Sequence, residues 1–223
     1  QVLDDTDRYG IEVALQLKEK FDAEVTVISM GSLGTEKGIQ QALQMGPDGA
    51  LVLEDDSLSG SNSLMTANVL SELSKKVEAD ITIFGTESTD GYSGVIPQQV
   101  SRMLGVPCIS YIKAVDIDES VTLTRQTSTG SEKVVMPSNC VLSVTAGGVE
   151  PRYPNFKDIM AAKSKPIERI SIADINYDAQ QNLEFVDIKD VSTTKQGEKI
   201  IDEGEGFQII IDKLKELKAI WKH

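Results

Sequence analysis

The segment Thr-Asp-Gly-Tyr-Ser-Gly-Val-Ile-Pro, residues 89–97, carries residue types that can bind a phosphate group. Gly91 and Gly94 allow backbone conformations in which several amide N–H groups point the same way, and Ser93 adds a hydroxyl donor. The start of a following helix adds partial positive charge, which favours an anion there. Asp90 would hold the loop by accepting backbone hydrogen bonds. An ordinary strand-to-helix turn explains the same residues equally well, because Asp-Gly is a common turn dipeptide.

A second glycine-containing segment covers residues 31–38 and also lies between an expected strand and an expected helix. Its spacing differs from the Gly-x-Gly-x-x-Gly pattern of dinucleotide-binding folds. Because Gly31 has no side chain, the backbone after Met30 can still approach a nucleotide closely. The segment 89–97 contains no lysine, which disfavours an ATP-hydrolysing phosphate loop there.

Residues for hydrolytic or metal chemistry are scarce in this chain. The only histidine is His223, and the two cysteines, Cys108 and Cys140, lie in apolar stretches and fit buried small side chains. A zinc site, a Cys-His dyad and a Ser-His-Asp triad therefore have no support. The acidic run 54–56 fits a solvated turn better than a metal site, because no second ligand cluster accompanies it.

Charge and hydropathy restrict the partners. The chain has 223 residues and a formal net charge of −13, which disfavours nucleic acid. No apolar run approaches the roughly 20 residues of a membrane helix, and the polar opening segment lacks the pattern of a signal peptide. We therefore expect a protein that is not inserted in a membrane.

The elements that must position the two loops alternate between strand and helix. Strands are expected at 24–30, 49–53, 80–85 and 106–113, with helices at 11–21, 34–45, from Asn62 or Ser63 to about 77, and at 95–104. This alternation predicts an α/β fold with a mostly parallel sheet and helices on both faces. Ligands of such sheets bind at the carboxyl ends of strands, so the loops after Met30 and Gly85 are the expected site.

The pattern changes after residue 113. Short alternating stretches at 115–117, 121–124 and 133–136 predict antiparallel hairpins at the edge of the sheet, and 139–145 predicts one more buried strand. Pro151 and Pro154 then stiffen a loop that contains Tyr153 and Phe156. These aromatic side chains either contact a partner or pack inward.

The remainder of the chain is polar and ends in an amphipathic helix at about 206–221. One of its faces is apolar, and it must be covered either by a partner subunit or by the chain's own domain. We therefore predict two parts: a nucleotide-binding α/β domain over 1–165 and an arm over 166–223.

Four segments, in this order, resemble the beta subunits of electron-transfer flavoproteins over about residues 4–167, and more weakly beyond. Residues 7–20 resemble the family's first helix, and 39–48 resemble its "ALAMGAD" stretch. Residues 88–97 match its phosphate-binding loop, and Pro151–Pro154 with Ile159, Met160 and Lys163 resembles its "PRYP…IMKAKKK" segment.

The resemblance implies an adenine-nucleotide-binding fold like that of universal stress proteins, with AMP as a structural ligand. It implies an alpha subunit that binds most of the redox FAD, with acyl-CoA or other flavin dehydrogenases and a quinone oxidoreductase as redox partners. The cytoplasm of a prokaryote is favoured over the mitochondrial matrix. The nucleotide would be bound by Asp4, Met30, Gly31, Asp90, Gly91, Tyr92, Ser93, Gly94, Val95 and Ile96. Dehydrogenases would be recognised by Tyr153, Phe156, Ile159 and Met160.

This sequence departs from the family in several respects: among them, Asp4 stands where the family often has Asn, and Ala161 and Ser164 replace lysines near Lys163. The family's first strand, with its "KQVPD"-like segment, is not among these residues, and that strand belongs in the middle of the sheet. Gly94 and Val95 stand where many members have Asn or Gln, which leaves the nucleotide open. One alternative is a subunit of an electron-bifurcating complex with a second FAD at this site. Another is a stand-alone nucleotide-binding protein similar to universal stress proteins.

Overall fold

The computed structural model describes residues 2–31, 34–177, 186–187, 189, 201–202 and 204–219. The chain divides into two compact units, residues 1–184 and 185–223. The first unit has an α/β architecture, as the sequence predicts. It extends past residue 165, the expected domain end, because strand β8 (Ile167–Ile170) pairs with β2 (Gly49–Glu54).

The strands of the first unit form two sheets. In the smaller sheet all strands are parallel, in the order β1 (Thr26–Gly31), β2, β8. The larger sheet has the order β3 (Ile81–Gly85), β7 (Cys140–Val144), β4 (Cys108–Ile117), β5 (Val121–Thr127), β6 (Gly130–Val135). The predicted α/β fold with parallel strands and helices on both faces is confirmed. Its strands are divided between two sheets, because β1 and β3 have no common strand among the described residues.

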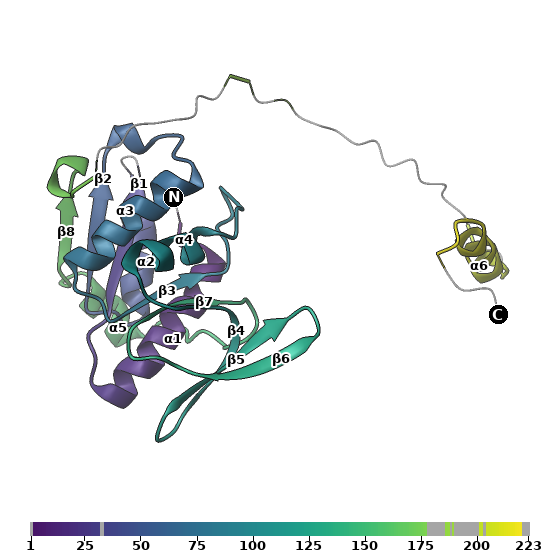
Figure 1. Cartoon of the computed structure of the whole chain (residues 1–223), viewed down its shortest axis with the longest axis horizontal. Coiled ribbons are helices and arrows are strands. Elements are labelled where there is room, and N and C mark those ends of the chain that lie inside the picture. Colours follow the sequence, from purple (N-terminus) through teal and green to yellow (C-terminus); the bar gives the residue numbers. More distant parts are fainter. Residues whose placement is uncertain are drawn as a thin grey trace. The chain divides into compact units, whose positions relative to one another are not determined.

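The larger sheet changes from parallel to antiparallel at β4. Strand β7 lies between β3 and β4 and is parallel to both, whereas β5 and β6 pair antiparallel with their neighbours. The predicted hairpins are thus confirmed, although residues 115–117 continue β4 instead of forming a separate strand. Figure 1 shows the β5–β6 hairpin projecting from the rest of the first unit.

Helices cover both faces of the sheets, because alternate residues of a strand point to opposite sides. Cys140, Leu142 and Val144 of β7 pack with α1 (Asp5–Phe21), whereas Val141 packs with α4 (Ile96–Leu104). In the smaller sheet one face packs on α2 (Glu36–Met45) and α5 (Phe156–Ala162). The other face packs on α3 (Ser63–Lys76).

Helix α3 packs on both sheets. Met65, Val69 and Leu73 pack against the smaller sheet, and Ala67 packs against Val141 of the larger one. Its start is fixed by Asn62, whose side chain accepts a hydrogen bond of 3.0 Å from the Met65 amide. Of the two predicted helix starts, Asn62 and Ser63, the structure thus has Asn62 as the cap. Not every apolar residue of these helices is in the core: Leu64 is 51% exposed and Phe21 is 52% exposed.

The second unit contains α6 (Gly206–Glu216). The Asp202 carboxylate accepts hydrogen bonds from the amides of Gly204 and Gly206 and so fixes the first turn. The helix ends before the predicted limit at residue 221, and that residue lies outside the described part of the chain. Among the described residues, no helix combines the length and apolar character needed to cross a bilayer.

Candidate functional site

Asp4 joins the start of α1 to the loop after β3. Its carboxylate accepts hydrogen bonds from the Thr6 amide at 2.8 Å and from the amide and hydroxyl of Thr89 at 3.2 and 2.6 Å. The helix start lies close to the end of β3, because a Cβ on Gly85 would be 3.2 Å from the Thr6 hydroxyl. Asp4 therefore caps α1 and fixes the loop with one carboxylate.

The residues before Asp4 contact α2. The Leu3 amide donates to Gln41 Oε1 at 2.9 Å, and a Cβ on Gly38 would be 3.3 Å from the carbonyl carbon of Val2. Residues 2–4 thus connect α2, which packs on the smaller sheet, with the loop that leaves the larger sheet. This connection links the sheet that contains β1 to the carboxyl end of β3, and ligands of α/β folds bind at such strand ends.

The loop itself places backbone donors before α4. Gly94 has φ of +63° and Tyr92 has φ of +46°, and the Tyr92 amide donates to the Ser88 carbonyl at 3.0 Å. Asp90 accepts a hydrogen bond from the Gly91 amide at 2.6 Å, as expected. In the described part of the chain no side chain caps α4, which starts after Val95. The amide groups of its first turn, except at Pro97, which has no N–H, can therefore donate to an anion.

The structure does not bring all the predicted site residues into contact. Asp4 and the loop 88–94 meet, and Val95 and Ile96 start the helix that follows. Met30 and Gly31 end β1, where Met30 packs against the core of the smaller sheet. Among the described residues, a Cβ on Gly31 would have only the Thr35 side chain within 4 Å, and residues 32 and 33 lie outside the described part.

Three carboxylates lie in this region. Partial burial alone would raise the pKa of Asp4, but hydrogen bonds from Thr89 and Thr6 outweigh it and hold that pKa below its ordinary value. Bonds from Ser88 and Gly91 lower the pKa of Asp90. Desolvation by surrounding protein, with the charges of Asp4 and Asp90, raises the pKa of Asp7 to about 6. A bound phosphate would therefore meet fixed negative charge beside the donors.

Asp7 is a functional candidate that the sequence argument missed. Thr89 lies in the predicted segment 89–97 but is not among the residues to which that argument gives a role. Asp7 carries no signal beyond its place in the first turn of a helix, where acidic residues are common. Thr89 precedes the Asp-Gly turn, and its role as a donor depends on Asp4, 85 residues away in sequence. The role of Thr89 can therefore be identified from the sequence only if the contact between Asp4 and Thr89 is itself predicted.

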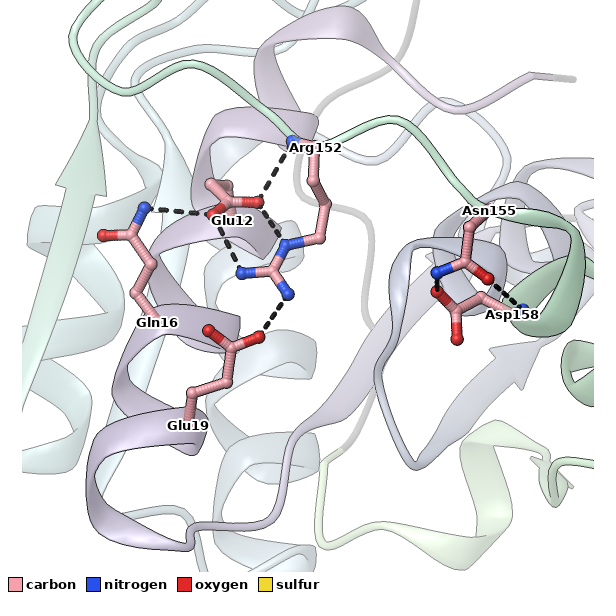
Figure 2. Close-up of polar contacts among 6 residues, drawn as sticks. All are labelled: Glu12, Gln16, Glu19, Arg152, Asn155 and Asp158. Atoms are coloured by element: carbon pink, nitrogen blue, oxygen red, sulfur yellow. Dashed lines mark hydrogen bonds and ion pairs between the residues drawn. The ribbon is translucent and has the colours of Figure 1, made fainter.

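A second candidate region is the segment 153–160, which we call the docking segment. Tyr153 is 90% exposed, Phe156 79% and Met160 49%, whereas Ile159 is half-buried. The alternative in which both aromatic side chains pack inward is therefore wrong. Asn155 starts α5 by accepting a hydrogen bond of 2.9 Å from the Asp158 amide (Figure 2). Exposed aromatic side chains next to a capped helix are typical of a protein contact surface.

Comparison with known proteins gives one consistent family. The sequence model of the "Electron transfer flavoprotein domain" matches residues 1–175. "Electron transfer flavoprotein subunit beta" of Mycobacterium leprae is 35% identical over 234 residues, covering 98% of this chain and 87% of that protein. The proteins of the same name from Mycobacterium tuberculosis and Bacillus subtilis are 33% and 31% identical. The match to the Mycobacterium tuberculosis protein covers 98% of this chain and 87% of that protein. The match to the Bacillus subtilis protein covers 80% of this chain and 70% of that protein.

Proposed function

Because this chain belongs to the electron transfer flavoprotein family and matches its beta subunits, we propose that it is the nucleotide-binding half of a heterodimeric flavin electron carrier. Beta subunits of this family carry electrons, and their name implies an alpha subunit as partner. In this proposal the chain supports the alpha-subunit FAD, receives electrons from acyl-CoA or other flavin dehydrogenases and passes them to a quinone oxidoreductase. The bacterial source of the relatives supports a prokaryotic cytoplasm as its location.

The nucleotide in this proposal is AMP, held as a structural ligand. One observation carries it: Asp4 fixes the loop after β3 directly before the start of α4, which no described side chain caps. Fixed amide donors and a helix N-terminus bind phosphate without a lysine. Gly94 and Val95 supply no side-chain donor, so recognition of the phosphate depends on the backbone and on Ser93.

The test is to release and count the nucleotides of the heterodimer. The full-length chain is purified with its alpha subunit, denatured with acid, and the supernatant is separated by chromatography and identified by mass. One FAD and one AMP per heterodimer support the proposal. Two FAD and no AMP would replace it with the bifurcating alternative. ATP without flavin would overturn the electron-carrier function altogether.

We further propose that the docking segment recognises the dehydrogenases. Phe156 and Met160 are one helical turn apart and both exposed, so they form one apolar surface on α5. Truncation of such an anchor weakens binding, whereas the fold of the subunit loses little when a side chain that is 79% exposed is removed.

Phe156→Ala should therefore raise the KM of an acyl-CoA dehydrogenase for this carrier by at least about tenfold, the lower range for a loss of one anchor. Flavin content and thermal stability of the heterodimer should not change. Val135→Ala is a matched control, because Val135 is an exposed apolar residue (64%) on β6, away from the docking segment. Equal KM values for Phe156→Ala and the unmodified protein would remove the docking proposal.

The apolar face of α6 is exposed among the described residues. On α6, Phe207 is 64% exposed and Ile210 is 55% exposed. We propose that the alpha subunit covers this face, as the predicted arm implies.

A further inference from the structure

We infer that Arg152 is a positioning residue, which holds the docking segment in its binding geometry through an ion pair with Glu12 of α1. We call this contact the Glu12–Arg152 clamp. The inference rests on the proposed docking of dehydrogenases. It adds to that proposal a residue that acts on binding without belonging to the apolar contact surface.

The clamp is a multiple contact to one buried carboxylate (Figure 2). Arg152 Nε donates to Glu12 Oε2 at 2.8 Å, and Arg152 Nη2 donates to Glu12 Oε1 at 3.0 Å. The Arg152 backbone amide also donates to Oε2, at 3.1 Å. Arg152 thus contacts both oxygens of the Glu12 carboxylate, through its side chain and its backbone amide. These contacts fix both the position and the orientation of Arg152.

The surroundings of the carboxylate strengthen the clamp. The Glu12 side chain is only 6% exposed, and Gln16 donates to its Oε1 at 3.0 Å. Burial alone would raise the pKa of Glu12, but the hydrogen bonds from Arg152 and Gln16 outweigh it and lower that pKa. Glu19, two helical turns from Glu12 along α1, pairs with Arg152 Nη1. The pair therefore remains ionised at neutral pH.

The docking segment is anchored on both sides of its exposed aromatic residues. Arg152 directly precedes Tyr153, Pro154 restricts the backbone after it, and Asn155 caps α5. At the far end Ala162 is fully buried between α2 and the smaller sheet. The exposed side chains themselves contribute little packing, so the order of this backbone comes from its anchors.

An ordered backbone lowers the entropy lost on binding, and this benefit appears in affinity. When the clamp is removed, the aromatic side chains remain present but their backbone samples more conformations. A bound partner would have to order it again. We therefore expect a higher KM for the carrier and an unchanged kcat at saturation, because no group that transfers electrons is altered.

The experiment uses the heterodimer with its bound flavin and compares Arg152→Met, Arg152→Lys and Lys18→Met. Lysine keeps a charge near Glu12 but loses the two-pronged contact, so this variant serves even where Arg152→Met fails to fold. Lys18→Met is the matched control. It breaks another ion pair between α1 and a distant loop, to Asp48, on a different side of the helix.

Two quantities are measured for each variant: steady-state KM and kcat with an acyl-CoA dehydrogenase and its acyl-CoA substrate, and hydrogen exchange of the amides in 153–160. Arg152→Met should raise KM by about tenfold and Arg152→Lys by about threefold, with faster exchange in this segment. Lys18→Met should change neither, even where it lowers thermal stability.

A KM that stays at the value of the unmodified protein in both Arg152 variants overturns the inference. So does a fall in kcat together with faster exchange throughout the first unit, because that pattern indicates general destabilisation. Phe156→Ala separates the inference from the docking proposal. If Phe156→Ala raises KM and the Arg152 variants do not, only the inference fails; if Phe156→Ala has no effect, the docking proposal fails first.

Discussion

Asp7→Asn tests the electrostatics of the candidate nucleotide site. The Asp7 carboxyl is near two carboxylates, Asp4 and Asp90, whose own pKa values are lowered, so both neighbours are ionised at pH 5 to 8. Ionised Asp7 adds a third negative charge at the place where a phosphate is proposed to bind. The asparagine has the same shape and removes that charge at every pH.

The size of the effect follows from the pKa, which rises from 3.8 to about 6. Two pKa units correspond to about 3 kcal/mol, and the exposed part of the Asp7 side chain reduces this by screening to about 1 kcal/mol. Because the folded-state pKa is raised, the protonated acid favours folding below pH 3.8, and this contribution is lost as pH rises through about 6. Asp7→Asn should therefore stabilise the protein by about 1 kcal/mol at pH 8 and by almost nothing at pH 4.

The same reasoning applies to ligand binding. At pH 8 Asp7→Asn should tighten AMP binding several-fold, and at pH 5, where only about a tenth of Asp7 is ionised, it should have little effect. The assays are thermal unfolding by circular dichroism and AMP titration by calorimetry, with heterodimer concentration and ionic strength held constant. Asp5→Asn, on the outer side of the same turn, is the control. A gain in stability or affinity that is equal at pH 5 and pH 8 would refute the reasoning.

Two further predictions concern the larger sheet and the arm. Gly148→Ala should destabilise the first unit by about 1–3 kcal/mol in chemical denaturation, because the new Cβ would be 2.4 Å from the Lys113 Cα. Gly91→Ala, with only the end of one serine side chain nearby, should change stability by less than about 0.5 kcal/mol. Replacing Phe207 and Ile210 together by serine should weaken the heterodimer at least about tenfold in sedimentation at serial dilutions, since each buried apolar side chain contributes about 1.5–3 kcal/mol. Unchanged dissociation would exclude the apolar face of α6 from the interface.

Local signals in the sequence were sufficient for most elements and for one side of the site. The alternation of strands and helices predicts the carboxyl-end loops, and the loop after Gly85 does lie beside Asp4. The cap at Asn62 follows from local chemistry and is confirmed. The division into two sheets does not follow, because pairing between strands distant in sequence determines it. Strand β8, with the sequence Ile-Glu-Arg-Ile, is too short and too charged for its pattern to indicate a sheet.

The Glu12–Arg152 clamp could not be predicted for a related reason. The two residues are 140 positions apart, and a glutamate in an amphipathic helix ordinarily faces solvent. Its partner lies in a loop whose prolines predict stiffness but not direction. Only the packing of that loop against α1 converts an ordinary surface residue into a buried carboxylate with four hydrogen bonds.

The orientation of α5 shows why the sequence pattern alone could not decide whether Phe156 packs inward or is exposed. The helix has two apolar stripes: Phe156 with Met160, and Ile159 with Ala162. Both stripes fit a buried face, and seven residues are too few for the pattern to distinguish them. The structure decides between them: Ala162 is fully buried against Leu43 of α2 and Val52 of β2, whereas Phe156 and Met160 are exposed. The small side chain therefore packs in the core and the larger ones face outward, so the exposure of Phe156 follows from the core packing of another face of the same helix.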